Sequence, residues 1–140
     1  MSVDFLDTSV FIYLFDDSDE RKRGIARELV QAALARDDAC ISHQVVQEAL
    51  NVATRKMAHP LALEDTHRFL RDVLMPLWRM MPSVEFYAKG LELQSQLKLS
   101  FYDALIVAGA LEAGCTRLLT DDLQHGQRIE GLRFENPFKK

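Results

Sequence analysis

Short apolar runs and longer amphipathic blocks alternate along the chain, and the two patterns predict different elements. The short runs are typical of buried strands, because most of their positions are apolar and polar residues follow them. They lie at residues 3–6, 39–42, 78–81, 116–120 and 132–134. The longer blocks carry apolar residues three or four positions apart, which predicts helices. These blocks lie at residues 10–15, 18–36, 45–57, 63–74, 84–97 and 104–111.

Polar residues and prolines indicate where these helices begin and end. Thr8 or Ser9 is expected to cap the first helix, and Ser18 the second, because hydroxyl side chains accept hydrogen bonds from the free N–H groups of a first turn. Ser42 ends the second strand and is expected to cap the helix that follows it. Pro76 is expected to end the helix at 63–74, because proline cannot donate a backbone hydrogen bond.

Apolar spacing also predicts which face of each helix is buried. The helix at 84–97 is expected to face the core through Val84, Tyr87, Ala88, Leu91 and Leu97. The helix at 45–57 is expected to do so through Val45, Val46, Ala49, Leu50, Ala53 and Met57. The helix at 104–111 is apolar at almost every position and is therefore expected to be buried against the sheet.

Strands that alternate with helices predict an α/β fold with right-handed crossovers. We expect a parallel central sheet of four to five short strands flanked by helices, in a single domain covering residues 1–140. A chain of 140 residues is long enough to bury a substantial core.

The composition is that of an ordinary soluble globular domain, with 48% hydrophobic and 27% charged residues. No apolar run is long enough to span a bilayer and no signal peptide precedes the first strand, so a cytoplasmic protein without membrane contact is expected. Cys40 and Cys115 are too few for a disulfide framework or a zinc cluster, which leaves two buried thiols. A net charge of −4 argues against general polyanion binding, yet it is compatible with a nuclease whose acidic pocket holds cations.

Acidic residues follow two of the predicted strands. Asp7 ends the first strand, and Asp121 and Asp122 end the fourth. Parallel strands bring their carboxyl ends to one edge of a sheet, where ligands bind in open α/β folds. Glu48 and Asp103 lie in or near the first turns of helices that begin at the same edge. The topology therefore predicts a cluster of carboxylates there.

Each of these acids also has an ordinary structural explanation. Glu48 is a good helix former, which usually faces water. Asp103 is the third residue after Ser100, a spacing that resembles a capping box. Aspartates that follow strands, as Asp121 and Asp122 do, are common turn formers.

Carboxylates packed together repel one another, and this repulsion indicates a cation. At ~5 Å and an effective dielectric constant near 20, each pair costs about 3 kcal/mol. The cluster stays ionised only if cations neutralise it; otherwise some members bind protons. Oxygen ligands without a nearby His or Cys favour Mg²⁺ or Mn²⁺ over zinc.

Other chemistries fit the sequence less well. The four histidines are dispersed, no glycine-rich phosphate loop is present, and Ser9 and Ser42 lack a convincing histidine partner for a hydrolase triad. The segment from Asp4 to Asp7 lacks the Asp-x-Asp pair of haloacid-type phosphatases. A receiver domain has a lysine after a late strand, and at that place this chain has Asp121 and Asp122 instead.

With these motifs in view, the sequence resembles the PIN domain family, and within it the VapC-like toxins of type II toxin–antitoxin modules. The resemblance is carried by five segments in family order: Phe5-Leu6-Asp7-Thr8-Ser9, Ser42-x-Gln44-Val45-x-x-Glu48, Tyr102-Asp103-Ala104-Leu105-Ile106, Leu119-Thr120-x-Asp122, and Gly131-Leu132-Arg133 with Asn136-Pro137-Phe138. It implies a PIN-like three-layer sandwich. It also assigns the catalytic and metal-binding acids to Asp7, Glu48, Asp103 and Asp122.

The last motif departs from the family pattern by offering two adjacent acids. The pattern favours Asp122, the second residue after Thr120, with Asp121 as the alternative on the expectation that adjacent side chains point to opposite sides. Thr8, Ser9 and Thr120 are expected to contact an acid or a phosphate oxygen, with helix capping the alternative for Thr8 and Ser9.

The resemblance implies a Mg²⁺-dependent endoribonuclease toxin, in which Mn²⁺ substitutes for Mg²⁺ and a metal-activated water cleaves RNA. It further implies a cognate antitoxin protein and a homodimer. The helices at 45–57 and 63–74 carry enough apolar surface to contact such partners, although core packing explains the same residues. The arginine and lysine residues at 21–23 and 27 form either a solvated face or a contact for RNA phosphates. The alternative to a nuclease is a catalytically inert PIN-like module that binds RNA or protein.

Overall fold

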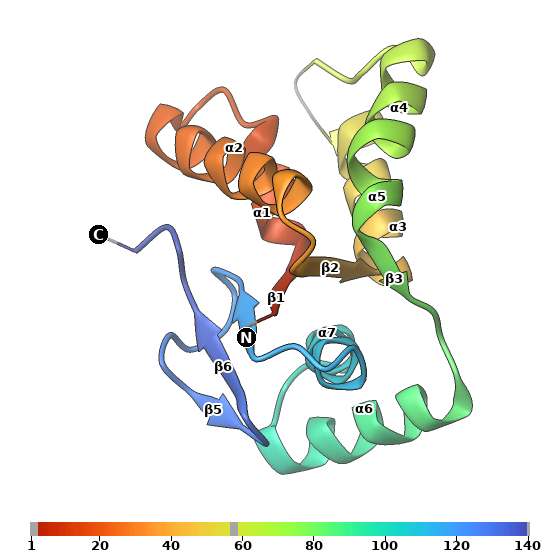
Figure 1. Cartoon of the computed structure of the whole chain (residues 1–140), viewed down its shortest axis with the longest axis vertical. Coiled ribbons are helices and arrows are strands. Elements are labelled where there is room, and N and C mark those ends of the chain that lie inside the picture. Colours follow the sequence, from red (N-terminus) through yellow and green to blue (C-terminus); the bar gives the residue numbers. More distant parts are fainter. Residues whose placement is uncertain (1–2, 57–58, 140) are drawn as a thin grey trace.

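A computed structural model describes residues 3–56 and 59–139 of the chain. Its strands form one sheet of order β3-β2-β1-β4-β6-β5, shown in Figure 1. All neighbouring strands are parallel except β5, which runs antiparallel to β6 at the edge. The strands are β1 (Asp4–Leu6), β2 (Ala39–Ser42), β3 (Trp78–Met80), β4 (Arg117–Leu119), β5 (Arg128–Ile129) and β6 (Leu132–Glu135).

Helices fill every connection between the four parallel strands β1 to β4. The helices are α1 (Thr8–Leu14), α2 (Glu20–Ala35), α3 (His43–Asn51), α4 (Leu63–Phe69), α5 (Met75–Leu77), α6 (Val84–Leu97) and α7 (Phe101–Glu112). Two π-helical turns, η1 (Val52–Lys56) and η2 (Leu70–Leu74), continue α3 and join α4 to α5. In Figure 1 the helices from α1 to α5 lie above the strands, and α6 and α7 lie below them. The predicted α/β class with a parallel sheet between helical layers is confirmed.

The strand order creates one topological switch point. From β1 the chain adds β2 and then β3 on one side, and it returns through α6 and α7 to place β4 on the other side of β1. The connections from the carboxyl ends of β1 and β4 therefore diverge, which opens the crevice where ligands bind in such sheets. Asp7 follows β1 and Asp121 lies two residues beyond β4, so both are at this crevice.

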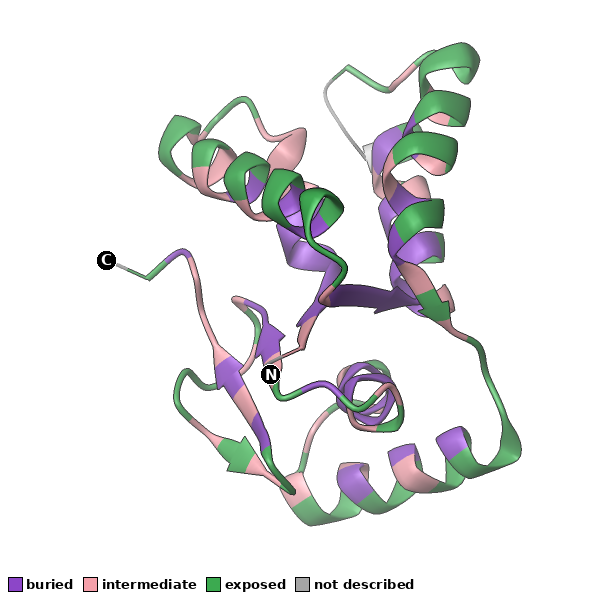
Figure 2. Cartoon of the chain, in the orientation of Figure 1, coloured by how far each residue is buried: buried purple, intermediate pink, exposed green. Residues whose placement is uncertain are grey.

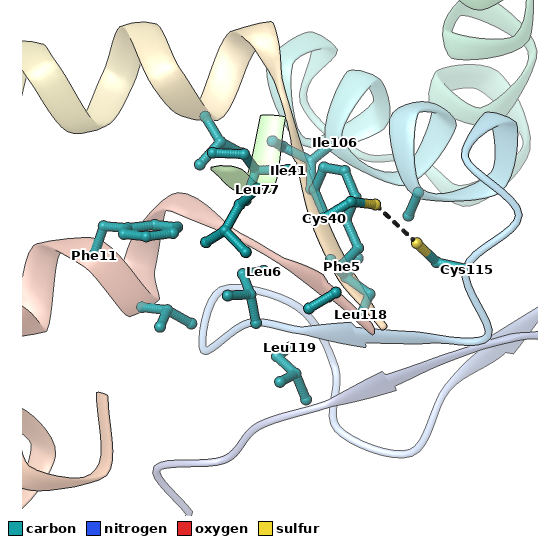
Figure 3. Packing of buried hydrophobic residues seen from close by; sticks show 14 of the residues in the cluster. Phe5, Leu6, Phe11, Cys40, Ile41, Leu77, Ile106, Cys115, Leu118 and Leu119 are labelled. Atoms are coloured by element: carbon teal, nitrogen blue, oxygen red, sulfur yellow. Dashed lines mark hydrogen bonds between the residues drawn. The ribbon is translucent and has the colours of Figure 1, made fainter. Parts of the chain in front are cut away.

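The core lies on both faces of the central strands. Phe5, Ile41 and Leu118 are fully buried (Figure 3), and most residues of α7 are buried against the sheet, as its apolar sequence predicted (Figure 2). At Gly109, α7 packs against the Phe5 ring of β1, which a Cβ would meet in ordinary contact at 3.7 Å. This packing fixes β1, and with it the position of Asp7.

Cys40 and Cys115 are both buried and free, as predicted, with 3.4 Å between their sulfur atoms (Figure 3).

Within the two described stretches of the chain, no helix combines the length and the apolar character needed to cross a bilayer.

Three predicted helix boundaries were wrong by one or a few residues: the starts of α1 and α2, and the end of the helix that begins at Leu63. Asp7 itself caps α1, so Thr8 and Ser9 belong to the helix. Asp19, rather than Ser18, caps α2 by accepting a hydrogen bond from the Lys22 backbone N–H. Carboxylates compete well for these positions because they favour the positive end of the helix dipole.

The helix that begins at Leu63 does not end at Pro76. It continues through α5 to Leu77, where Pro76 occupies one of the first two positions of the short helix. Proline is tolerated there because those positions need no intrahelical donor. Met57, predicted to extend the apolar face of the preceding helix, lies outside the described residues.

The predicted core face of α6 was also wrong. Val84 and Leu91 are 82% and 58% exposed, whereas Phe86, Gly90 and Leu93 are buried. The cause is close packing against α7, since a Cβ on Gly90 would meet Leu105 at 2.6 Å. Helix α6 therefore faces α7 with Gly90, its smallest residue. A prediction from apolar spacing does not count glycine as a core residue, so it chose the wrong face.

Strand β5 was missed because it has only two residues. It pairs with β6 through a tight turn in which Glu130 and Gly131 both have positive φ. This turn geometry is typical of two-residue hairpins and favours glycine.

Candidate active site

The four acids assigned by the sequence come from four separate elements at the carboxyl edge of the sheet. Asp7 follows β1, Glu48 lies in α3, Asp103 lies in the first turn of α7, and Asp122 lies in the loop after β4. Their charges act on one another: Glu48 and Asp122 raise the pKa of Asp7, while Asp103 and Glu48 raise the pKa of Asp122. The fold has therefore brought all four into one electrostatic neighbourhood.

Asp7 is the most deeply placed of the four, with only 5% of its surface exposed. One carboxyl oxygen, Oδ1, accepts a hydrogen bond of 2.7 Å from the Thr8 backbone N–H, which makes Asp7 the cap of α1. The other, Oδ2, accepts a hydrogen bond of 2.6 Å from the Thr120 hydroxyl. Its backbone N–H donates to the Leu119 carbonyl at 3.0 Å. Asp7 is thus held in a fixed orientation between two adjacent strands.

Burial raises the pKa of Asp7 to about 7. The Thr120 and Thr8 hydrogen bonds lower it, whereas the charges of Asp122 and Glu48 raise it further. The net effect is a carboxyl group that is only partly ionised at neutral pH when no cation is bound.

Thr8 connects Asp7 to Glu48. Its backbone N–H donates to Asp7, and its hydroxyl donates to Glu48 Oε1 at 2.7 Å. A single residue at the start of α1 therefore orients two of the four acids. This bears out the expectation that Thr8 contacts an acid, while its alternative role as a cap belongs to Asp7.

Asp103 is oriented through the start of α7. Ser100 caps this helix by accepting a hydrogen bond of 3.2 Å from the Asp103 backbone N–H, as the capping-box spacing predicted. Gln44 in α3 donates through Nε2 to the Tyr102 carbonyl at 3.1 Å, which ties the two helices together beside the site. The Gln44 Oε1 atom is buried without a hydrogen-bond partner.

Asp122 lies at the open side of the site. Its backbone N–H donates to the Thr120 hydroxyl oxygen at 3.1 Å, and the same hydroxyl donates to Asp7. Thr120, fully buried, therefore joins the two acids that follow β1 and β4. The pKa of Asp122 is raised to about 6, first by partial burial of its carboxyl group and then by the adjacent Asp121.

Asp121 has different partners from the other acids. Its Oδ2 accepts a hydrogen bond of 2.5 Å from the Tyr13 hydroxyl, and its backbone N–H donates to Ser9 Oγ at 3.4 Å. Lys22 in α2 donates to the Tyr13 hydroxyl oxygen at 3.1 Å. The expectation that the two adjacent side chains point to opposite sides stays a prediction.

The donor set suits a hard divalent cation, because it consists of carboxylates whose mutual repulsion a cation would relieve. Across the described residues, no three His, Cys, Asp or Glu side chains stand close enough together to hold one ion. The residues therefore fit Mg²⁺ or Mn²⁺ in their chemistry, and side-chain rotation would be required for them to converge on an ion.

Sequence reasoning missed two residues of this region. Tyr13 was assigned to the apolar face of the first helix, and Lys22 was included in a basic face on the second. A usable signal was present, since Ser9 and Tyr13 are four residues apart and so share one face of α1. Nothing in the sequence indicated that this face would meet the loop after β4.

The comparisons with known proteins agree with this fold. A family model described as the PIN domain matches residues 5–128. A search of the curated proteins finds no match to the chain.

Solved structures from bacterial toxin–antitoxin systems share the fold. The DNA-bound VapBC complex from Salmonella typhimurium matches with a TM-score of 0.68 and 22% identity, covering 98% of this chain and 99% of that one. A toxin–antitoxin complex from Klebsiella pneumoniae matches with a TM-score of 0.67 and 22% identity, covering 95% and 96%. VapC20 of Mycobacterium tuberculosis, described as a sarcin-ricin loop cleaving toxin, matches with a TM-score of 0.64 and 20% identity, covering 85% and 89%.

Proposed function

The chain belongs to the PIN domain family, and on that premise we propose that it is a metal-dependent endoribonuclease toxin controlled by a cognate antitoxin protein. The observation that carries the proposal is the placement of Asp7, Glu48, Asp103 and Asp122 at the carboxyl edge of the sheet, near enough for their charges to act on one another. Carboxyl groups that raise one another's pKa do not stabilise a fold, so their proximity indicates a functional site.

Asp7 and Asp103 would hold the principal Mg²⁺, and Glu48 and Asp122 would complete the site directly or through water. When bound, the metal would supply Lewis-acid activation of a water molecule and neutralise charge on the phosphate. Mn²⁺, which also prefers oxygen ligands, would substitute.

The protein's own contribution is to fix the acids before the substrate arrives. Thr8 orients Asp7 and Glu48 together, and Thr120 orients Asp7 against the loop that carries Asp122. Preorganised groups of this kind need little rearrangement during the reaction, which is the main way in which a protein lowers a barrier of this type.

The solved structures support the choice of substrate and partner. VapC20 is described by its ability to cleave the sarcin-ricin loop, which is consistent with RNA as the substrate class. The Klebsiella and Salmonella structures are toxin–antitoxin complexes, which is consistent with inhibition by a small antitoxin. A homodimer is proposed on the family resemblance alone.

The direct test is cleavage of a structured RNA by the purified chain with and without Mg²⁺. We expect cleavage that EDTA abolishes, and a loss of at least about 100-fold in Asp7→Asn and Asp103→Asn, because each removes a charged metal ligand. Asp65→Asn is the matched control, since Asp65 is an exposed residue of α4 outside the acid cluster. Folded Asp7→Asn protein that cuts as fast as the wild type would rule out this mechanism.

The competing proposal is an inert PIN-like module that binds RNA or protein without cutting it. Calorimetric titration with Mn²⁺ at neutral pH separates the two. Binding that Asp7→Asn abolishes supports the nuclease, and the absence of binding by the wild type supports the inert module.

A further inference from the structure

We propose that a hydrogen-bond chain from helices α1 and α2 positions Asp122, with Asp121 as its last link. The inference rests on the proposed function, because it assigns Asp122 to the metal site. It gives the adjacent acid a different task, that of a positioning residue.

The first link joins helix α1 to Asp121 at two points. The Tyr13 hydroxyl donates to Asp121 Oδ2 at 2.5 Å, and the Asp121 backbone N–H donates to Ser9 Oγ at 3.4 Å. Ser9 and Tyr13 are one helical turn apart, so they present these contacts from the same face of α1. Both the backbone and the side chain of Asp121 are therefore held by α1, which is itself anchored to the site because Asp7 caps it.

The second link fixes Tyr13. Lys22 donates to its hydroxyl oxygen at 3.1 Å and lies 4.8 Å from the centre of its ring. The ring also packs against Phe138, with 4.6 Å between ring centres. Arg21 in turn donates to the Phe138 carbonyl at 2.7 Å, which secures the C-terminal segment against α2. Tyr13 is thus held by a cation and an aromatic ring at once.

The third link runs from Asp121 to Asp122. Asp122 follows Asp121 directly in the chain, so a backbone held at Asp121 restricts Asp122 as well, and the Asp122 backbone N–H donates to the Thr120 hydroxyl oxygen at 3.1 Å. The loop is consequently tied to Asp7 on one side, through Thr120, and to α1 on the other, through Asp121. Asp122 is otherwise an exposed loop residue, and side chains of this kind sample many orientations unless their neighbours restrict them.

The hydrogen bonds of Asp121 argue that it does not act as a metal ligand. Its Oδ2 already accepts a hydrogen bond from the Tyr13 hydroxyl, whose oxygen in turn accepts one from Lys22. Asp121 therefore contacts the site through its neighbour.

Substitutions at Asp121 separate the two roles. In Asp121→Asn the amide oxygen still accepts from Tyr13 and the amide nitrogen can donate to Asp122, so a positioning role survives while a ligand role is lost. Asp121→Ala removes both roles. Tyr13→Phe removes only the hydroxyl and keeps the ring on Phe138. Tyr87→Phe is the matched control, because Tyr87 lies on the exposed face of α6.

The measurements are single-turnover RNA cleavage at saturating Mg²⁺ and Mn²⁺ binding by calorimetry. We expect Asp121→Asn and Tyr87→Phe to stay within about threefold of the wild type in both. Asp121→Ala and Tyr13→Phe should each lower the cleavage rate by about tenfold with an unchanged KM for RNA, corresponding to about 1.4 kcal/mol. The double variant Tyr13→Phe/Asp121→Ala should be no slower than Asp121→Ala, because both changes break the same chain.

Two results would overturn the inference alone: an Asp121→Asn variant as damaged as Asp121→Ala in Mn²⁺ affinity, or a Tyr13→Phe variant that cuts at the wild-type rate. A wild-type chain that neither cuts RNA nor binds Mn²⁺ would instead refute the proposed function, and the inference with it. Should Asp121→Ala fail to fold, Tyr13→Phe, which removes a single oxygen atom, gives the decisive comparison.

Discussion

Strand β1 begins with one aspartate, Asp4, and is followed directly by another, Asp7, and the two have opposite surroundings. Asp4 at the amino end accepts two hydrogen bonds from Arg117, at 2.9 and 2.7 Å, and Arg117 also pairs with Glu135 at 2.9 Å. Asp7 at the carboxyl end accepts hydrogen bonds from the Thr8 N–H and the Thr120 hydroxyl, neither of which carries a charge.

The difference separates structural from functional use of the same residue type. At the amino end of β1, the Arg117 guanidinium pairs with the Asp4 carboxylate and compensates its charge. At the carboxyl end, several carboxylates meet without a cation among the contacts described for Asp7, and burial raises the pKa of Asp7 to about 7. A site that lowers stability in this way is typical of a position selected for ligand binding.

The largest expected consequence is a pH dependence of stability. Between about pH 4 and about pH 7, folded Asp7 keeps its proton, whereas the unfolded chain, in which the ordinary aspartate pKa is 3.8, has lost it. The contribution of Asp7 to the free energy of unfolding of the metal-free protein should therefore be highest below about pH 4. It should fall as the pH rises to about 7. At ~1.4 kcal/mol per pKa unit, the full effect is on the order of 4 kcal/mol.

Urea unfolding at a series of pH values measures this slope. Asp7→Asn should flatten it, leaving the smaller contribution of Asp122, which has the same sign because its pKa is raised to about 6. An equal slope in the wild type and Asp7→Asn would show that Asp7 is ionised in the folded protein at all these pH values.

A divalent cation should remove the difference between the two ends of β1. Mn²⁺ at 100 times its dissociation constant should raise the free energy of unfolding by ~2.7 kcal/mol, because it binds only the folded chain. Thermal unfolding should show an increase in Tm that EDTA reverses and that Asp7→Asn lacks, whereas Asp4→Asn retains it. An increase that survives in Asp7→Asn would place the ion elsewhere.

The smallest effect is expected from breaking the neutralised end. Arg117→Met should lower the free energy of unfolding by about 1–2 kcal/mol, because it leaves Asp4 without its arginine and Glu135 with Arg133 alone, while solvent partly screens these charges. Arg117→Lys should recover only part of the loss, since lysine cannot make the paired hydrogen bonds to Asp4. Mn²⁺ affinity, measured by calorimetry, should be unchanged in both; a loss of affinity would mean that the two ends of the sheet are coupled.

Much of the fold could be predicted from local patterns. The parallel strands were recognisable because each is a short apolar run followed by polar residues, and α7 because it is apolar throughout. Asp7 could be identified as a site residue from its place after a strand. Glu48 could not be singled out by spacing alone, because a glutamate in a helix is usually exposed, and its assignment depended on the family motif.

The remaining features depend on contacts between segments far apart in the sequence. The buried face of α6 is set by the fit of Gly90 against Leu105, and the different tasks of the two adjacent aspartates are set by Tyr13, more than 100 residues earlier. The sequence by itself determined most of the elements and the candidate Asp7, since these follow from local periodicity and residue type, and the family motif added Glu48. Only the tertiary structure decided which faces meet and which carboxyl group each hydroxyl orients, because these depend on distances that no local pattern encodes.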